Sequence, residues 1–155
     1  MNKKIILLTI LVLLPASFSH SQTDMRNSAA QNNAAKPNTQ MTKSSPAYAE
    51  LLLRKTERES ELEEFLIGYT EEFPKVKEIR FELGLLQKAT DKILAVNASE
   101  AGKLTLALGK LMVRKTELET DLWNLRRQYE DDHPEVKRAR RKIEVYEKAI
   151  KEILP

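Results

Sequence analysis

The residue most suited to chemistry is His133, the only histidine after the N-terminal segment, which follows Asp131 and Asp132. An imidazole beside carboxylates could bind a metal ion or carry a proton near neutral pH. Phe73 occupies the same place in the first unit of an internal repeat described below, and phenylalanine can do neither. We therefore interpret His133 as a solvated turn residue and expect no metal site.

The motifs of known catalytic sites do not occur in this sequence. It has no cysteine, no glycine-rich phosphate loop and no nucleophile elbow. Acids and bases are plentiful, but no pattern places two of them in a pocket with opposed pKa values. We expect a protein that is not an enzyme, with no catalytic residue, no cofactor-binding residue and no cofactor.

Basic residues gather around Pro134 and could bind an anionic glycan, lipid headgroups or an acidic protein. Acidic residues, among them Glu130 and Glu135, are interleaved with them, and a run of mixed charge is more often a solvated face. Both interpretations stay open. The candidate interaction surface consists of Arg126, Arg127, Lys137, Arg138, Arg140, Arg141 and Lys142.

An internal repeat organises the chain. When the sequence is shifted by 60 residues without a gap, residues 54–57 (RKTE) match 114–117 (RKTE), and Pro74 matches Pro134. Helical proteins share composition, so scattered matches would mean little. A gapless register that keeps a proline and a four-residue run indicates two copies of one structural unit.

Each unit contains two tracts in which apolar residues are spaced alternately by three and four. Such a narrow stripe is the seam of a coiled coil, and no tract alternates with period two as a strand would. Lys55 and Lys115 interrupt the seams at equivalent places; each could set the register or lay its stem along the seam. The seams include Leu51, Leu62, Phe65 and Tyr69; Val76, Ile79, Leu83, Leu86 and Ile93; Leu111, Leu118, Leu122, Leu125 and Tyr129; and Val136, Ala139, Ile143, Tyr146, Ile150 and Ile153.

The two tracts of each unit are separated by a proline, with His133 beside the second one. Proline disfavours helix in the residue before it and suits the first turn of a new helix. The seam keeps its phase across both breaks, so a kink and a turn both fit. We favour turns at Pro74, His133 and Pro134, because folding back buries each stripe on its neighbour.

The predicted fold is all-α, with two tandem helical hairpins and coiled-coil-like heptad packing. The first helix begins at a Ser45 cap with Pro46 in its first turn, and Asn97 with Glu100 resembles a capping box for the third. Apolar residues off the stripe indicate the inside of a bundle or an oligomer contact: Leu106, Met112 and Val113. The four helices are expected near 46–72, 75–95, 98–131 and 135–154.

The N-terminal segment has the features of a secretory signal peptide: Lys3 and Lys4, an apolar run over 5–14, and small residues at 19 and 21. That run is too short for a spanning helix, and no second one follows, so we expect an exported, periplasmic or secreted chain that is not integral to the membrane once the signal is cleaved. The alternative is an uncleaved N-terminal anchor. A polar segment without apolar periodicity comes next. The expected segments are a signal peptide (1–21), a disordered linker (22–45) and the two hairpins (46–96 and 97–155).

Removing Lys3 and Lys4 lowers the formal charge of the chain from +3 to +1. A nucleic-acid-binding protein would usually show a clear basic excess. Together with export, this near-neutral charge leads us to expect no nucleic-acid partner.

One motif resembles a known family: Leu122-x-x-Leu125-x-x-x-Tyr129-x-x-x-His133-Pro134-x-Val136, followed by Ile143. It is similar to the periplasmic coiled-coil segment of bacterial polysaccharide chain-length determinants, or polysaccharide co-polymerases. The resemblance implies a helical hairpin in a Gram-negative-type envelope and a link to polysaccharide assembly. Members also have two membrane spans, which this sequence does not contain.

Together these features favour a non-enzymatic, exported coiled-coil scaffold or protein-interaction module of the cell envelope. We expect its heptad seams to bind a protein partner or a second copy of the chain. The alternative is a periplasmic holdase-type chaperone, in which helical arms hold unfolded clients.

Overall fold

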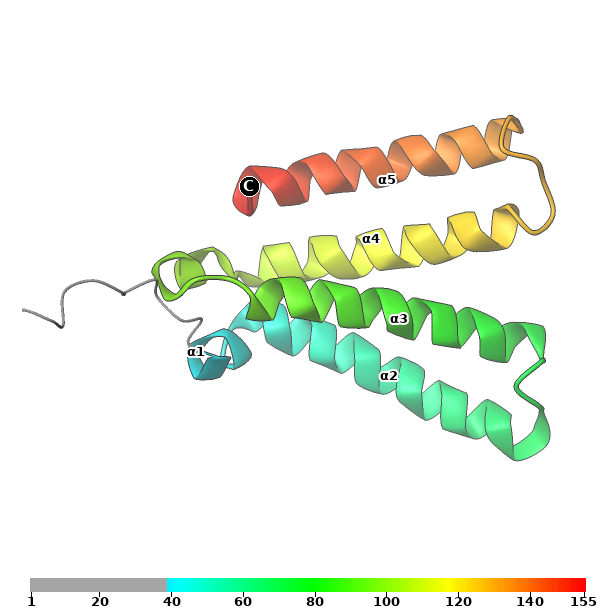
Figure 1. The fold of residues 1–155 in the computed structure, drawn as a ribbon, viewed down its shortest axis with the longest axis horizontal. Helices are drawn as coiled ribbons and strands as arrows, with labels where there is room; N and C mark the ends of the chain where they lie inside the picture. Colours follow the sequence, from blue (N-terminus) through cyan, green and yellow to red (C-terminus); the bar gives the residue numbers. More distant parts are fainter. Residues whose placement is uncertain (1–38) are drawn as a thin grey trace, which may run out of the picture. The chain divides into compact units, whose positions relative to one another are not determined.

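The computed structural model describes residues 39–155, which are all-helical and contain no strand (Figure 1). The expected signal peptide and the greater part of the expected linker lie outside these residues. The elements are α1 (Thr39–Lys43), α2 (Pro46–Gly68), α3 (Pro74–Leu94), the 3₁₀ helix η1 (Ala98–Lys103), α4 (Leu106–Leu125) and α5 (Pro134–Ile153).

The four long helices lie alongside one another in residues 46–153 (Figure 1). α2 and α3 run in opposite directions and pack together, and so do α4 and α5. α4 also packs against both α2 and α3. α4 is therefore buried on two faces, one against α5 and one against α2 and α3. Its heptad stripe alone would predict burial of a single face.

A side-chain hydroxyl caps the first long helix of each repeat unit, at equivalent positions of the repeat. The Ser45 side chain accepts a hydrogen bond from Tyr48 N at 3.2 Å, and Pro46 occupies the first turn, which confirms the predicted helix start. Sixty residues on, Thr105 accepts from Leu108 N at 3.3 Å. Each cap satisfies one of the free N–H groups of its helix.

The single third helix expected over 98–131 is wrong. The chain forms η1, breaks at Leu104, and begins α4 at Leu106. Leu104 is only 1% exposed, and its carbonyl accepts a hydrogen bond from Ala47 N at 3.2 Å. Holding this residue in the core takes it out of helical geometry, and Asn97 makes no side-chain cap.

The short helix α1 falls within the segment expected as a linker. Thr42 is fully buried, and its carbonyl accepts a hydrogen bond from the Ser45 hydroxyl at 2.7 Å. α1 packs against α2, α3 and η1. Helical structure is therefore present before the cap of α2, within the range expected as a linker.

Two apolar clusters hold the helices together. The smaller one lies near the end of α2, where Leu62 packs with Val76 and Ile79. The larger one joins α2, α3, α4 and the 95–105 connection, and burying side chains of this size supplies most of the driving force for folding. Its buried members are Ala47, Leu51, Leu86, Ala89, Ile93, Val96, Leu104, Leu108 and Met112.

A buried carboxylate, Glu82 of α3, joins three helices. Its Oε1 accepts a hydrogen bond from Arg54 Nε at 3.0 Å, and Arg58 lies 3.9 Å from the other oxygen. Arg54 Nη2 also lies 3.1 Å from Glu117 of α4. A buried charge is tolerated only when it is paired, so this cluster fixes how α2, α3 and α4 meet.

The two breaks between paired helices share their contacts. Tyr69 stacks on Phe73 with 4.0 Å between ring centroids, and Tyr129 stacks on His133 at 4.1 Å. An arginine of the following helix pairs with an acid of the break in both units. These ion pairs are Arg80 with Glu71 and Arg140 with Asp131.

Candidate functional site

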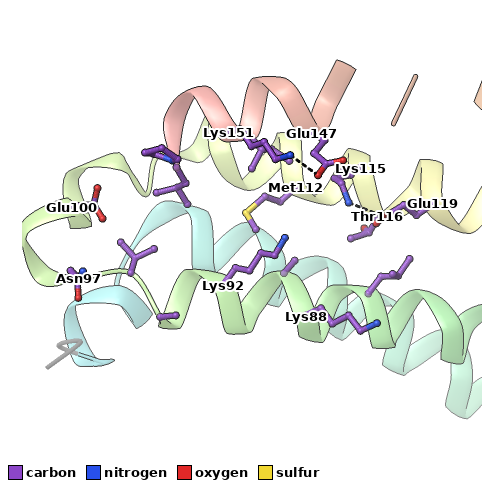
Figure 2. A pocket seen from close by; sticks show the side chains of 17 residues that line it. Lys88, Lys92, Asn97, Glu100, Met112, Lys115, Thr116, Glu119, Glu147 and Lys151 are labelled. Carbon is purple, nitrogen blue, oxygen red and sulfur yellow. Dashed lines mark hydrogen bonds and ion pairs between the residues drawn. The ribbon is translucent and has the colours of Figure 1, made fainter. Parts of the chain in front are cut away.

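A groove of about 650 Å³ lies between α3 and α5, and residues of α4 line it between them (Figure 2). We call it the α3–α5 groove. Its volume is in the range of pockets that hold a ligand or a short peptide segment. The residues that line it come from α3, α4, α5, η1 and the connection after α3.

The floor of the α3–α5 groove is apolar. Met112 of α4 lies at its centre and is 3% exposed, with its sulfur directed into the groove (Figure 2). Methionine adapts to irregular partners because its side chain is unbranched and polarisable. The apolar lining consists of Leu85, Ala89, Val96, Met112, Ile150 and Leu154.

Ion pairs line the α4 and α5 side of the groove. Lys115 Nζ lies 2.5 Å from Glu119, and Lys151 Nζ lies 3.1 Å from Glu147. The hydrogen bond from Lys151, with the charges of Lys115 and Lys92, holds the pKa of Glu147 below its ordinary value. This carboxylate therefore stays ionised at neutral pH.

The α3 side of the groove carries two lysines, Lys88 and Lys92. Lys88 and Lys92 are one helical turn apart, and neither forms an ion pair with any residue in the described 39–155 region. Figure 2 shows Lys92 extending from α3 toward Met112, with the Lys151–Glu147 pair on the opposite wall. This wall therefore presents two lysines that form no ion pair in the described residues beside an apolar floor, with Lys92 near enough to Glu147 for its charge to lower the pKa of that carboxyl.

An aromatic shelf continues the groove between α3 and α4. Phe81 and Trp123 stack with 5.1 Å between ring centroids, and the Arg127 guanidinium lies 4.8 Å from the Trp123 ring centroid. Leu85 and Glu119 line both the shelf and the groove. The apolar strip therefore extends beyond the lysine wall.

The structure divides the basic residues that the sequence grouped around Pro134. Arg126 and Arg140 both pair with Asp131, at 2.9 and 2.5 Å, and Arg138 pairs with Glu135. Within residues 39–155, no ion pair involves the remaining members on α5: Lys137, Arg141 and Lys142. Two of the seven therefore pair with an acid of the second break, and a third pairs within the first turn of α5.

His133 acts as the N-cap of α5. Its Nδ1 accepts a hydrogen bond from Glu135 N at 3.3 Å, while its ring stacks on Tyr129. Among the described residues no group of three or more His, Cys, Asp or Glu side chains could hold a metal ion. The contacts of this histidine are local and serve the start of the helix.

The other residues singled out from the sequence lie in different surroundings. Met112 is a core residue and Val113 packs against the same cluster, so both belong to the inside of the bundle. Leu106 is 47% exposed. Lys55 donates a hydrogen bond to Gln87 of α3 at 2.9 Å, which places its ammonium at the edge of the α2–α3 contact.

Sequence reasoning missed the α3–α5 groove and the buried Glu82. The groove depends on where α5 sits relative to α3, which the seams of the separate units do not specify. A signal for it existed in Leu85, an apolar residue off the stripe of α3. For Glu82 the signal is weaker, because one glutamate among many gives no sign of burial.

Comparisons of the whole chain with protein-family models, curated proteins and solved structures gave no match. None of the helices within residues 39–155 combines the length and apolar character needed to cross a bilayer.

Proposed function

We propose that this chain is an exported protein-interaction module of the cell envelope, built from two tandem helical hairpins with heptad packing. Its α3–α5 groove binds an amphipathic helix of a partner protein, with acidic residues along the edges of that helix. The observation that carries this proposal is the apolar groove whose α3 wall holds Lys88 and Lys92, neither of which forms an ion pair in residues 39–155.

The dimensions of the groove favour a helix. Its lining covers two turns on each wall, from Leu85 to Lys92 and from Glu147 to Leu154, or roughly 10 Å on each side. Two helices beside a third leave a trough for a fourth, and a helix placed there would contact the floor at i, i+3, i+4 and i+7. Met112 would adapt to its side chains.

The charges of the groove favour binding over catalysis. Lys115 and Lys151 are neutralised by Glu119 and Glu147, which leaves Lys88 and Lys92 to select an acidic partner. Complementary charge at a rim raises the rate and specificity of association. The chain is therefore proposed to be non-enzymatic.

The N-terminal signal-like segment supports export, and the motif around His133 and Pro134 supports a place in the envelope near polysaccharide assembly. The basic residues of α5 that lack ion pairs in the described region could contact an anionic envelope component. These two assignments concern where the protein is located, whereas the groove is the surface proposed to bind the partner.

The binding test uses a fluorescent peptide of about 14 residues, which is nearly four helical turns. It carries leucines at i, i+3, i+4 and i+7 and glutamates along both edges. We expect saturable binding by anisotropy, and Lys88→Glu with Lys92→Glu to weaken it at least roughly tenfold. Lys137→Glu with Lys148→Glu is the matched control, because these exposed lysines lie elsewhere on α5.

A peptide with lysines along its edges should bind at least roughly tenfold more weakly than the acidic one. Equal affinity for the two peptides, or no effect of the Lys88 and Lys92 changes, would contradict the proposal. The holdase alternative predicts a different result. In that case the chain suppresses aggregation of a denatured protein, and the two lysine changes leave that activity intact.

A further inference from the structure

Three side-chain pairs join α4 to the helices of the first repeat unit. Arg54 of α2 pairs with Glu117 of α4 at 3.1 Å, and Asn124 of α4 donates to Glu78 of α3 at 2.9 Å. The third pair is the stack of Phe81 on Trp123. In all three, a residue of the first unit meets one on the inner face of α4.

Each pair has an equivalent that would join two copies of the chain. The first-unit residue is replaced by the residue 60 positions later in one copy, and the second-unit residue by the residue 60 positions earlier in the other copy. Arg54 and Glu117 become Arg114 and Glu57, and all pairs so obtained join exposed residues of opposite charge. The three shifted pairs are Arg114 with Glu57, Arg138 with Glu64, and Arg141 with Glu63.

We propose that a second copy of this chain docks its α2 on the outer face of α4 and α5, and so repeats the internal stacking of the units. The basic face is formed by Arg114, Arg138 and Arg141. The acidic face, on α2 of the next copy, is formed by Glu57, Glu63 and Glu64. Opposite charges at equivalent register positions give this contact its direction.

Two exposed apolar side chains fit the same register. Leu52 is 49% exposed and is equivalent to Met112, which lies in the core at the internal contact. Val145 is 67% exposed and is equivalent to Leu85, which lines the hollow beside the Phe81–Trp123 stack. Docking of a second copy would cover both of these side chains.

The contact between copies is looser than the internal one. Gly109 allows α4 to approach Ala47 closely, but Ala49 stands at the position equivalent to Gly109. Lys142 replaces the buried Glu82, and Arg114 already pairs with Glu117 of its own chain at 2.8 Å, so no buried carboxylate would join the two copies. We therefore expect reversible association that weakens as salt screens the charges.

The two faces are different surfaces, so the contact is head-to-tail and leaves a free face at each end. Association should therefore continue beyond dimers as concentration rises. The faces are also separate from the lysine wall of the α3–α5 groove. Failure of peptide binding at the groove would leave this proposal standing, and the reverse also holds.

Sedimentation velocity of the purified chain tests the proposal. We expect the sedimentation coefficient to rise with concentration and to fall with added salt. Arg138→Glu with Arg141→Glu, on the basic face, should weaken association at least roughly tenfold, and so should Glu63→Lys with Glu64→Lys. Circular dichroism should show unchanged helicity, since all four side chains are exposed.

The decisive sample mixes the two double variants. Each keeps one intact face that fits the intact face of the other, and the reversed charges of the two variants are again opposite in sign. An equimolar mixture should therefore regain association that grows with concentration, whereas each variant alone associates weakly. A chain that stays monomeric at all concentrations, association that ignores both variants, or a mixture that stays monomeric would overturn the proposal.

Discussion

A Cβ atom on Gly109 would lie 2.9 Å from the Cα of Ala47, so α4 crosses α2 more closely than a side chain permits. The crossing lies beside the Ala47 N–H that donates to the Leu104 carbonyl. This single approach sets where the second repeat unit rests on the first, and with it the position of the groove floor.

Gly109→Ala should therefore destabilise the fold by roughly 1–3 kcal/mol, because the obstructing atoms are the Cα and carbonyl oxygen of Ala47 and the Cβ of Glu50, none of which is the free end of a flexible side chain. Gly84→Ala is the matched control. It lies within α3 with nothing near its Cβ position, so it should stabilise the helix by roughly 0.5–1 kcal/mol. Urea unfolding followed by circular dichroism measures both; equal effects would contradict the crossing.

Removal of the buried carboxylate should be costly. Glu82→Ala removes the buried carboxylate that Arg54 and Arg58 share. The two arginines then have only less buried partners, among them Glu117 and Glu61, so we expect a loss of roughly 1.5–3 kcal/mol in the free energy of unfolding. The exposed Glu63→Ala should change it by less than about 0.5 kcal/mol. The triple variant Glu82→Leu, Arg54→Met and Arg58→Met should recover most of the lost free energy of unfolding. No recovery would show that the loss does not come from the charges left behind without Glu82.

The second break should show a dependence on pH. A hydrogen bond from Arg140, with a second from Arg126, holds the pKa of Asp131 below its ordinary value. A lowered carboxyl pKa adds stability above the unfolded value of about 3.9, and this stability is lost as pH falls through the lowered pKa. NMR titration of the Asp131 carboxyl should show its midpoint rise in Arg140→Ala.

The neighbouring Arg141→Ala is the control for that titration, since Arg141 forms no ion pair in the described part of the chain. It should leave the Asp131 midpoint in place. The stability difference between Arg140→Ala and the unchanged chain should be largest above about pH 5 and vanish below about pH 2. A midpoint that ignores Arg140 would remove this ion pair from the account.

The hairpin arrangement can be tested by crosslinking, because the chain has no cysteine of its own. Lys55 and Gln87 share a hydrogen bond between α2 and α3, so Lys55→Cys with Gln87→Cys should react with a short bis-maleimide within one chain. A continuous rod would separate them by roughly 48 Å. The control is Thr56→Cys with Gln87→Cys, because Thr56 is exposed on α2 beside Lys55. This pair should react far more slowly, and equal rates would count against the hairpin.

Local signals in the sequence predicted some features well. Ser45 followed by Pro46 marks a helix start in any context, and the structure confirms the cap. The apolar stripe of the second tract also selected buried residues, since Val76, Ile79, Leu86 and Ile93 are all 0% exposed. Caps and stripes depend on neighbours within a few residues, so a sequence alone records them.

Features that join distant segments were not predictable in the same way. The break at Leu104 arises because its carbonyl accepts a hydrogen bond from the backbone N–H of Ala47, which is far away in the chain. The burial of Met112 and Gly109 follows from α4 packing on two sides, whereas the seam of its own unit requires only one. The α3–α5 groove depends on the same long-range packing.

The most direct test of the proposed function is an NMR titration of the ¹³C-methyl-labelled methionines with the acidic-edged peptide. Met112 lies on the groove floor, whereas Met41 is 48% exposed in α1 and lines no part of the groove. Met112→Leu assigns the resonance. We predict that the Met112 methyl signal shifts saturably, at the affinity found by anisotropy, while the Met41 signal stays in place. Peptide binding that leaves the Met112 signal unmoved would contradict the account.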